Sequence, residues 1–214
     1  MKADLVFKSK RPKALETQEY TCQGCGYKTK PETVSKQEKG RSHMDVHHRD
    51  DDHHNNDESN FCVVCLLCHA YQHVGQSDRR SDTSPAENMG GQTAFISVPE
   101  IAATDLNLLQ RAIGVALHDD AEEAIALGIY DALKNRTQYV AEEFGSFKTA
   151  DFAAAFASLN SKEYAGRVQK ITDLRLRFSL HLIKGFGREF MLDYPSLPLA
   201  AWAGVLKTSG RKFA

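Results

Sequence analysis

The 214-residue sequence contains no apolar run long enough to cross a membrane, and it has no cysteine after position 68. The longest uninterrupted apolar run near its C-terminus, Pro198 to Leu206, is much shorter than the about 20 residues that a membrane-spanning helix needs. The N-terminus is charged and carries no apolar stretch of signal-peptide length, which argues against export through a cleaved signal. We therefore expect a cytoplasmic protein without membrane insertion.

The sequence also has almost no net charge, but this total conceals a local split. Residues 1–41 hold ten Lys or Arg against five Asp or Glu, whereas residues 42–73 hold one against six. The first stretch therefore has the charge expected of an anion-facing surface. The second contains Asp50-Asp51-Asp52, which would repel a phosphodiester unless a cation neutralised it, and we interpret it as a solvated loop.

All five cysteines lie between positions 22 and 68, which is not typical of the disulfide framework of a secreted domain. Cys22-Gln-Gly-Cys25 and Cys65-Leu-Leu-Cys68 are two C-x-x-C pairs separated by a long insert. Such pairs can supply four thiolates in a tetrahedral array. The sequence therefore predicts a structural zinc ion held by these four cysteines.

Cys62 leaves an alternative open, because Cys62-Val-Val-Cys65 is also a C-x-x-C pair. We favour Cys65 with Cys68, since this choice places His69 and His73 at the start of the following helix. Their i, i+4 spacing then puts both imidazoles on one helix face. Cys62 becomes a small strand residue, which is the commoner role of a lone cysteine.

The hydrophobic periodicity predicts an α+β protein. Strands are expected at 43–48 and 61–66, a helix from Cys68, and a further strand at 93–98. Helical stripes then dominate, with Thr104 as one N-cap and with Asp120 and Glu123 as a capping box, before a weaker strand period over 174–182. A last helix is expected between 196 and 206.

These elements suggest three parts of the chain. The first is a small ββα zinc module at 1–75, and the second is a polar linker at 76–92. The third is a mostly α-helical region at 93–214 that we expect to bind a partner.

The order of the motifs resembles that of the HNH, or ββα-metal, nuclease module. Over about residues 17–75 the sequence passes through C-x-x-C, then His47-His48, then Asn60, and then C-x-x-C-His-x-x-x-His. The resemblance implies that His48 is a general base and that Asn60 orients it. It also implies three histidine ligands for a second divalent ion, which would be magnesium, manganese, nickel or zinc: His47, His69 and His73. Neutral imidazole suits transition divalents, and histidine can accept a proton near neutral pH.

A second resemblance, to the DotN (IcmJ) family of type IVB secretion systems, extends over the whole chain. It is carried by the order of several short motifs: Tyr20-Thr-Cys-Gln-Gly-Cys-Gly26, Asn55-Asn56, Ser59-Asn60, Gly90-Gly-Gln-Thr-Ala-Phe-Ile-Ser-Val-Pro-Glu100, Ile129-Tyr130 and Glu142-Glu-Phe-Gly145. The family implies an HNH-like zinc-bound fold in a subunit of the coupling complex. Such a subunit binds the C-terminal segment of the DotL coupling ATPase, joins other coupling-complex subunits and is recruited with them to the inner membrane.

Two functions therefore compete. The first is a coupling-complex subunit that supports substrate presentation, and the dedicated C-terminal region and the near-zero charge favour it. The second is a metal-dependent endonuclease that hydrolyses DNA phosphodiesters. It is favoured because the histidine set is intact, whereas the family members that serve secretion have lost nuclease residues. A conjugation system, whose substrate is DNA, would give such a site a purpose.

Overall fold

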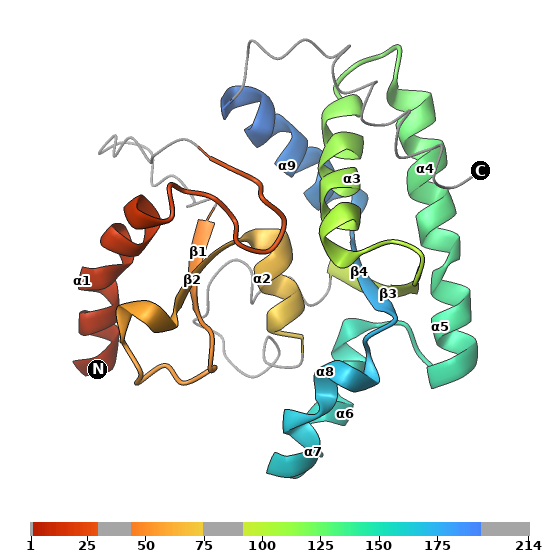
Figure 1. The fold of residues 1–214 in the computed structure, drawn as a ribbon. Helices are drawn as coiled ribbons and strands as arrows, with labels where there is room; N and C mark the ends of the chain where they lie inside the picture. The colour runs from red at the N-terminus through yellow and green to blue at the C-terminus, as the bar shows by residue number, and fades with distance from the viewer. Residues whose placement is uncertain (1, 30–43, 75–91, 194–214) are drawn as a thin grey trace. The chain divides into compact units, whose positions relative to one another are not determined.

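The computed structural model describes residues 2–29, 44–74 and 92–193 (Figure 1). The chain forms two compact units, Met1–Gln72 and His73–Ala214, and each combines helices with a two-stranded antiparallel sheet. The α+β fold class predicted from the sequence is confirmed. The expected linker lies almost entirely outside the described residues, so the domain limits drawn from it stay a prediction, and the expected last helix lies outside them as well.

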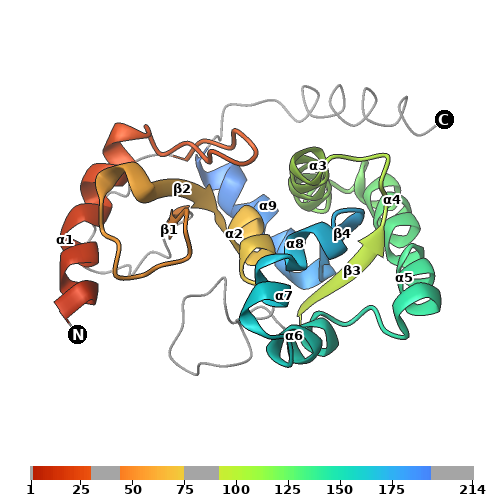
Figure 2. The same cartoon turned by 60° about the horizontal axis from the view of Figure 1, so that its bottom comes forward.

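The first unit is built around a short β-hairpin between two helices. Its elements are α1 (Lys2–Thr17), β1 (Met44–His48), the 3-10 turn η1 (Glu58–Asn60), β2 (Phe61–Cys65) and α2 (Leu66–Gln72). Both predicted strands are confirmed, and the helix after them begins two residues earlier than predicted. Figures 1 and 2 show α1 and α2 on opposite sides of the hairpin.

The hairpin has one face for each helix because strand side chains alternate. β1 pairs with β2 from Met44 opposite Cys65 to His48 opposite Phe61. Met44, Val46 and His48 are buried, whereas the two residues between them are less so. Two consecutive histidines at the end of β1 therefore point to opposite faces of the hairpin.

Helix α1 was not foreseen, because residues 1–19 resemble only a basic lead-in. Its inner side is anchored by Leu15, which is buried, and by Gln18 just beyond its end. The Gln18 side chain donates to the carbonyl of Phe61 and accepts from the amide of Val63, at 3.1 and 2.9 Å. The helix is thus fixed to β2 by tertiary contacts rather than by its own apolar periodicity.

Among the described residues, the second unit contains seven helices and a two-stranded antiparallel sheet. The two strands of this sheet lie far apart in the sequence. The elements of the second unit are β3 (Thr93–Ser97), α3 (Ala103–Ala116), α4 (Glu123–Asn135), α5 (Thr137–Phe144), α6 (Thr149–Ala157), α7 (Ser161–Ala165), α8 (Arg167–Lys170), β4 (Leu174–Phe178) and α9 (Leu180–Asp193). β3 pairs antiparallel with β4, with Thr93 opposite Phe178 and Ser97 opposite Leu174. The weak strand period at the start of 174–182 is therefore a real strand.

Gln110 ties α3 to this sheet. Its side chain is fully buried, donates to the carbonyl of Leu176 and accepts from the amide of Phe178. The surrounding core is formed by fully buried side chains: Phe95, Ile96, Ile113, Phe178 and Ile183. A buried amide with both ends satisfied fixes which residue of α3 faces which residue of β4.

Three local predictions are wrong. Helix α3 has Ala102, not Thr104, at its N-cap, and the expected capping box before α4 does not form because Glu122 takes the N-cap position. The strand period does not continue to residue 182, since α9 begins at Leu180. A complete capping box lies instead at Asn160 and Glu163, where it starts α7.

Within the described ranges, no helix combines the length and the apolar character needed to cross a membrane.

Candidate functional site

Cys22 and Cys25 lie in a tight turn that directs their sulfurs toward the hairpin. Cys22 and Tyr27 are joined by a backbone bond of 2.8 Å, and the amide of Gln23 donates to the carbonyl of Val63. A Cβ atom at Gly24 would lie 2.9 Å from the Cys68 sulfur, so a side chain there would push that sulfur out of its place. Gly26 has φ +73°, a conformation that glycine adopts without strain.

The four predicted cysteines come together at this turn. Cys65 ends β2 and Cys68 lies in the first turn of α2, and their sulfurs join those of Cys22 and Cys25 within 4.8 Å of one another. The Cys25 and Cys65 sulfurs are 3.7 Å apart. Four sulfurs around a tetrahedral zinc, each at about 2.3 Å, would be about 3.8 Å apart. The cluster therefore has the donor set and spacing of a closed structural zinc site.

The proximity of the thiols changes their acidity unequally. The Cys25 side chain, hydrogen-bonded to the Cys22 sulfur, lowers the pKa of Cys22 to about 7. The same type of contact with Cys22 raises the pKa values of Cys25 and Cys68. Four thiols crowded in this way cannot all ionise without a cation among them, which is the charge that zinc would supply.

Cys62 is not a member of this cluster. Cys62 pairs with His47 in the hairpin. It lies between Phe61 and Val63 on β2, so its side chain is on the opposite face of the strand from theirs. Of the two C-x-x-C pairs that the sequence offered, the structure therefore brings Cys65 and Cys68 to the first pair.

The three predicted histidine ligands also come together. His47 lies at the end of β1, His69 on α2 and His73 directly after α2, and one ring nitrogen from each lies within 4.8 Å of the other two. His69 and His73 are buried, and the side chain of His47 is 11% exposed. Three converging, nearly buried imidazoles suit a transition divalent better than magnesium, which prefers oxygen ligands.

Asp45 supports this cluster and was missed in the sequence analysis. Its carboxylate lies 2.9 Å from Nδ1 of His69, which leaves Nε2 of that ring as the nitrogen that can bind an ion. The carboxylate of Asp51 lies 3.6 Å from Nε2 of His47. Asp45 precedes His47 by two residues on one strand, so the alternation of strand side chains could have identified it.

His48, the expected general base, lies on the other face of β1. It is 4% exposed and is enclosed by the rings of Phe7 on α1 and Phe61 on β2, with ring centroids 5.0 and 5.3 Å away. Its Nε2 lies 3.3 Å from the Oδ1 acceptor of Asn56, so this nitrogen carries the proton. In this arrangement His48 is a packed residue beneath α1.

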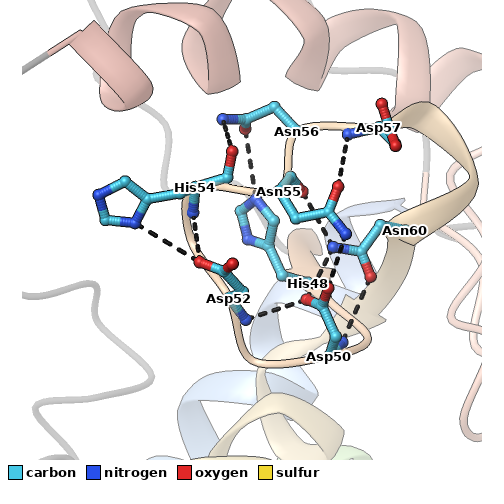
Figure 3. Close-up of polar contacts among 8 residues, drawn as sticks. All are labelled: His48, Asp50, Asp52, His54, Asn55, Asn56, Asp57 and Asn60. Carbon is cyan, nitrogen blue, oxygen red and sulfur yellow. Dashed lines mark hydrogen bonds and ion pairs between the residues drawn. The ribbon is translucent and has the colours of Figure 1, made fainter.

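Asn60 closes the loop between the strands (Figure 3). Its Nδ2 donates to Oδ1 of Asp50 and to the carbonyl of Asn55, at 2.8 and 2.9 Å. Asp50 also accepts hydrogen bonds from the side chain of Asn55 and from the backbone amide of Asp52. Together these bonds lower the pKa of Asp50 to about 2, and the bond from Asn60 has the largest effect. The amide that contacts His48 belongs to Asn56, in place of the expected Asn60.

Four cations of the basic N-terminal stretch make contacts within their own unit. Lys13 pairs with Glu58 and Lys28 with Glu19, each at 2.8 Å. Lys10 donates to the carbonyl of Asn56, and Arg11 to that of Met44. Lys10, Arg11 and Lys13 thereby hold α1 on the loop and the hairpin, and these three cations are engaged within the unit.

Comparison with known proteins links the chain to a secretion apparatus protein. No model of a known protein family matches the chain. A curated protein, the type 4 apparatus protein DotN of Legionella pneumophila subsp. pneumophila, is 31% identical over 148 residues. The match covers 67% of this chain and 59% of that protein.

Proposed function

This chain belongs to the DotN (IcmJ) family, and we propose that it works as a component of the coupling complex of a type IVB secretion or conjugation system. In this role it is a cytoplasmic, zinc-stabilised, HNH-like protein that binds the C-terminal segment of the coupling ATPase. It reaches the inner membrane through that complex and supports the presentation of substrates.

One observation carries the choice of a binding role over a catalytic one. His48 is buried under Phe7 of α1, on the face of β1 opposite the cluster of His47, His69 and His73. A general base must lie within hydrogen-bond reach of the water that it deprotonates, and that water must lie at the metal. The position of His48 therefore supports a nuclease-like scaffold used for assembly.

Zinc has a structural role in this proposal. Cys22 and Cys25 lie in the turn after α1, while Cys65 and Cys68 join β2 to α2, so an ion among them would tie both ends of the module together. Because the site is assembled only on folding, the free energy of binding would stabilise the fold. We expect about one tightly held zinc ion per chain by elemental analysis.

The experiment that tests the binding role is purification of the tagged chain from its native cells, followed by a binding measurement with purified components. We expect the coupling ATPase to copurify, and its isolated C-terminal segment to bind the chain directly. If the ATPase does not copurify and its segment does not bind the zinc-loaded chain, the proposed function is wrong.

A nuclease is the second candidate, because the three histidine ligands and the acidic partner of one of them are all in place. It is tested by incubating plasmid DNA with the purified chain and manganese, magnesium or nickel. We expect no nicking above that of a His48→Ala variant. Robust nicking that disappears in this variant would replace the binding role with hydrolysis of DNA phosphodiesters.

A further inference from the structure

One short helix, α2, carries ligands of both clusters of the first unit. These are the cysteine cluster, formed by Cys22, Cys25, Cys65 and Cys68, and the histidine cluster, formed by His47, His69 and His73. Cys68 and His69 are consecutive residues of α2, and His73 directly follows its last residue. The backbone of α2 therefore connects the two clusters covalently.

The two clusters lie at different positions along the β-hairpin. Cys65 is the last residue of β2 and pairs with Met44, whereas His47 lies three residue pairs further along the ladder. At about 3.3 Å for each strand residue, this is a displacement of about 10 Å. Because α2 follows Cys65 directly, it must run back along the hairpin for His73 to reach His47.

The direction of α2 decides whether the histidine cluster can close around an ion. His73 follows Cys68 by five residues, which is about 7.5 Å along a helix. A tilt of α2 by about 10° at its first turn would displace His73 by about 1 Å. Distances between a metal and its ligands are held to within about 0.2 Å. His47 cannot follow such a movement, because its strand is paired with β2.

The residues of α2 do not fix this direction by themselves. The helix has seven residues, and isolated helices shorter than about 12–15 residues are marginal in water. Leu66, Leu67 and Ala70 are buried, but hydrophobic burial is non-directional. An ion bound by Cys65 and Cys68 would clamp the first turn of α2 to the turn of the first C-x-x-C pair, in a tetrahedral geometry that allows one direction.

We propose that the cysteine cluster controls the histidine cluster. Zinc bound by the four thiolates orients α2, and this orientation gives the three imidazoles a high affinity for a transition divalent ion. The two sites are thus loaded in order, with zinc first. By thermodynamic linkage, an ion at the histidine cluster holds the zinc more tightly by the same factor. This inference rests on the structural zinc of the proposed function and adds a second, dependent metal site to it.

The linkage is tested by the rate at which N-ethylmaleimide alkylates the cysteine cluster in the zinc-loaded, untagged full-length chain. Zinc protects its thiolates, so alkylation reports how often the cysteine cluster opens. We expect saturating nickel to slow this alkylation at least fivefold. The His47→Ala variant, which lacks one imidazole of the histidine cluster, should show no effect of nickel. An alkylation rate of the unaltered chain that is the same with and without nickel would overturn the inference.

The role of α2 as the connection is tested at Gln72, which is exposed and belongs to neither cluster. In an α-helix the amide of residue 72 bonds to the carbonyl of residue 68, so Gln72→Pro removes a bond between the two sites and leaves all seven ligands in place. We expect Gln72→Pro to keep its zinc in elemental analysis but to bind nickel at least tenfold more weakly in calorimetry. Gln72→Ala, the matched control, should bind nickel as the unaltered chain does.

Equal nickel affinity of the Gln72→Pro and Gln72→Ala variants would overturn α2 as the connection. Absence of nickel binding by the unaltered, zinc-loaded chain would overturn the dependent site. Both outcomes leave the proposed function standing, because binding of the coupling ATPase segment is measured separately. A purified chain that holds no zinc would contradict both this inference and the structural zinc on which it rests.

Discussion

His47 and His48 are consecutive in the sequence, yet their side chains lie on opposite faces of β1. His47 joins His69 and His73, whereas His48 lies against Phe7. The strand alternation that separates them makes their substitutions distinguishable.

We predict that His47→Ala abolishes tight nickel binding to the zinc-loaded chain, because it removes one of three imidazole ligands. His48→Ala should leave the nickel affinity within about twofold and should instead lower thermal stability, because it removes a buried ring. Isothermal titration calorimetry and thermal unfolding measure the two effects. Equal loss of nickel affinity in both variants would contradict this arrangement.

Asp45 is predicted to act on the metal through His69. Its carboxylate fixes the ring at 2.9 Å, and loss of such a partner typically lowers metal affinity about 10 to 100-fold. We expect Asp45→Ala to reduce nickel affinity by that factor. Asp57→Ala is the matched control, since its carboxylate has no hydrogen-bond partner in the described part of the chain. An affinity loss that is the same for both would indicate a nonspecific charge effect.

The cysteine cluster predicts a difference between neighbouring cysteines of β2. Cys65→Ser should prevent recovery of soluble, folded protein and of stoichiometric zinc, because Cys65 contributes a sulfur to the cluster. Cys62→Ser should retain both properties, because Cys62 lies outside it. Elemental analysis and size-exclusion chromatography provide the measurement. A normal thermal transition after complete chelation would refute a structural role for the metal.

The loop closed by Asn60 should depend on pH through Asp50. The pKa of Asp50 is about 2 in the folded protein, below its ordinary value of 3.8. A lowered folded pKa means that the stabilisation is fully present above about pH 4 and is lost as the pH falls through about 2. The thermal midpoint of the unaltered chain should therefore exceed that of Asp50→Asn above pH 4, and the difference should shrink below it. A difference in thermal midpoint that stays the same between pH 6 and pH 2.5 would contradict this assignment. Asp57→Asn is the control, and its difference from the unaltered chain should not shrink in this way.

Two glycines in helices of the second unit should respond oppositely to the same substitution. A side chain on Gly114 would lie 2.2 Å from the carbonyl oxygen of Ile183 in α9, so Gly114→Ala forces the helices apart and should cost about 1–3 kcal/mol. Gly128→Ala enters open space and should stabilise α4 by about 0.4–1 kcal/mol. Urea unfolding monitored by circular dichroism measures both. Stabilisation by Gly114→Ala would show that α3 and α9 do not approach so closely.

Much of the first unit could be predicted from local patterns. The C-x-x-C spacing identified the four cysteines that meet, since ligands two residues apart on a tight turn have few other arrangements. The short apolar segments at 43–48 and 61–66, separated by a loop rich in turn formers, located β1 and β2 to within a residue. Helix α1 escaped detection because its sequence has no apolar stripe, and its position depends on tertiary bonds such as those of Gln18.

The start of α9 shows a second limit of local patterns. Leu174 to Leu182 alternate with polar residues throughout, yet the strand ends at Phe178. Ser179 then accepts the amide of Leu182 at 3.4 Å, which favours a helix from that point. A short apolar segment is compatible with both the strand period and the helix period, so its tertiary contacts decide which of the two structures it forms.

By itself, the sequence indicated which cysteines and histidines would come together as possible metal ligands, the ββα order of the first module and the mostly helical character of the second unit, because these depend on ligand chemistry and on short-range periodicity. Only the tertiary structure decided that His48 lies under α1 and that Asn56 and not Asn60 contacts it. Burial and long-range hydrogen bonds place residues that are far apart in the chain, and no local pattern encodes which of them will meet.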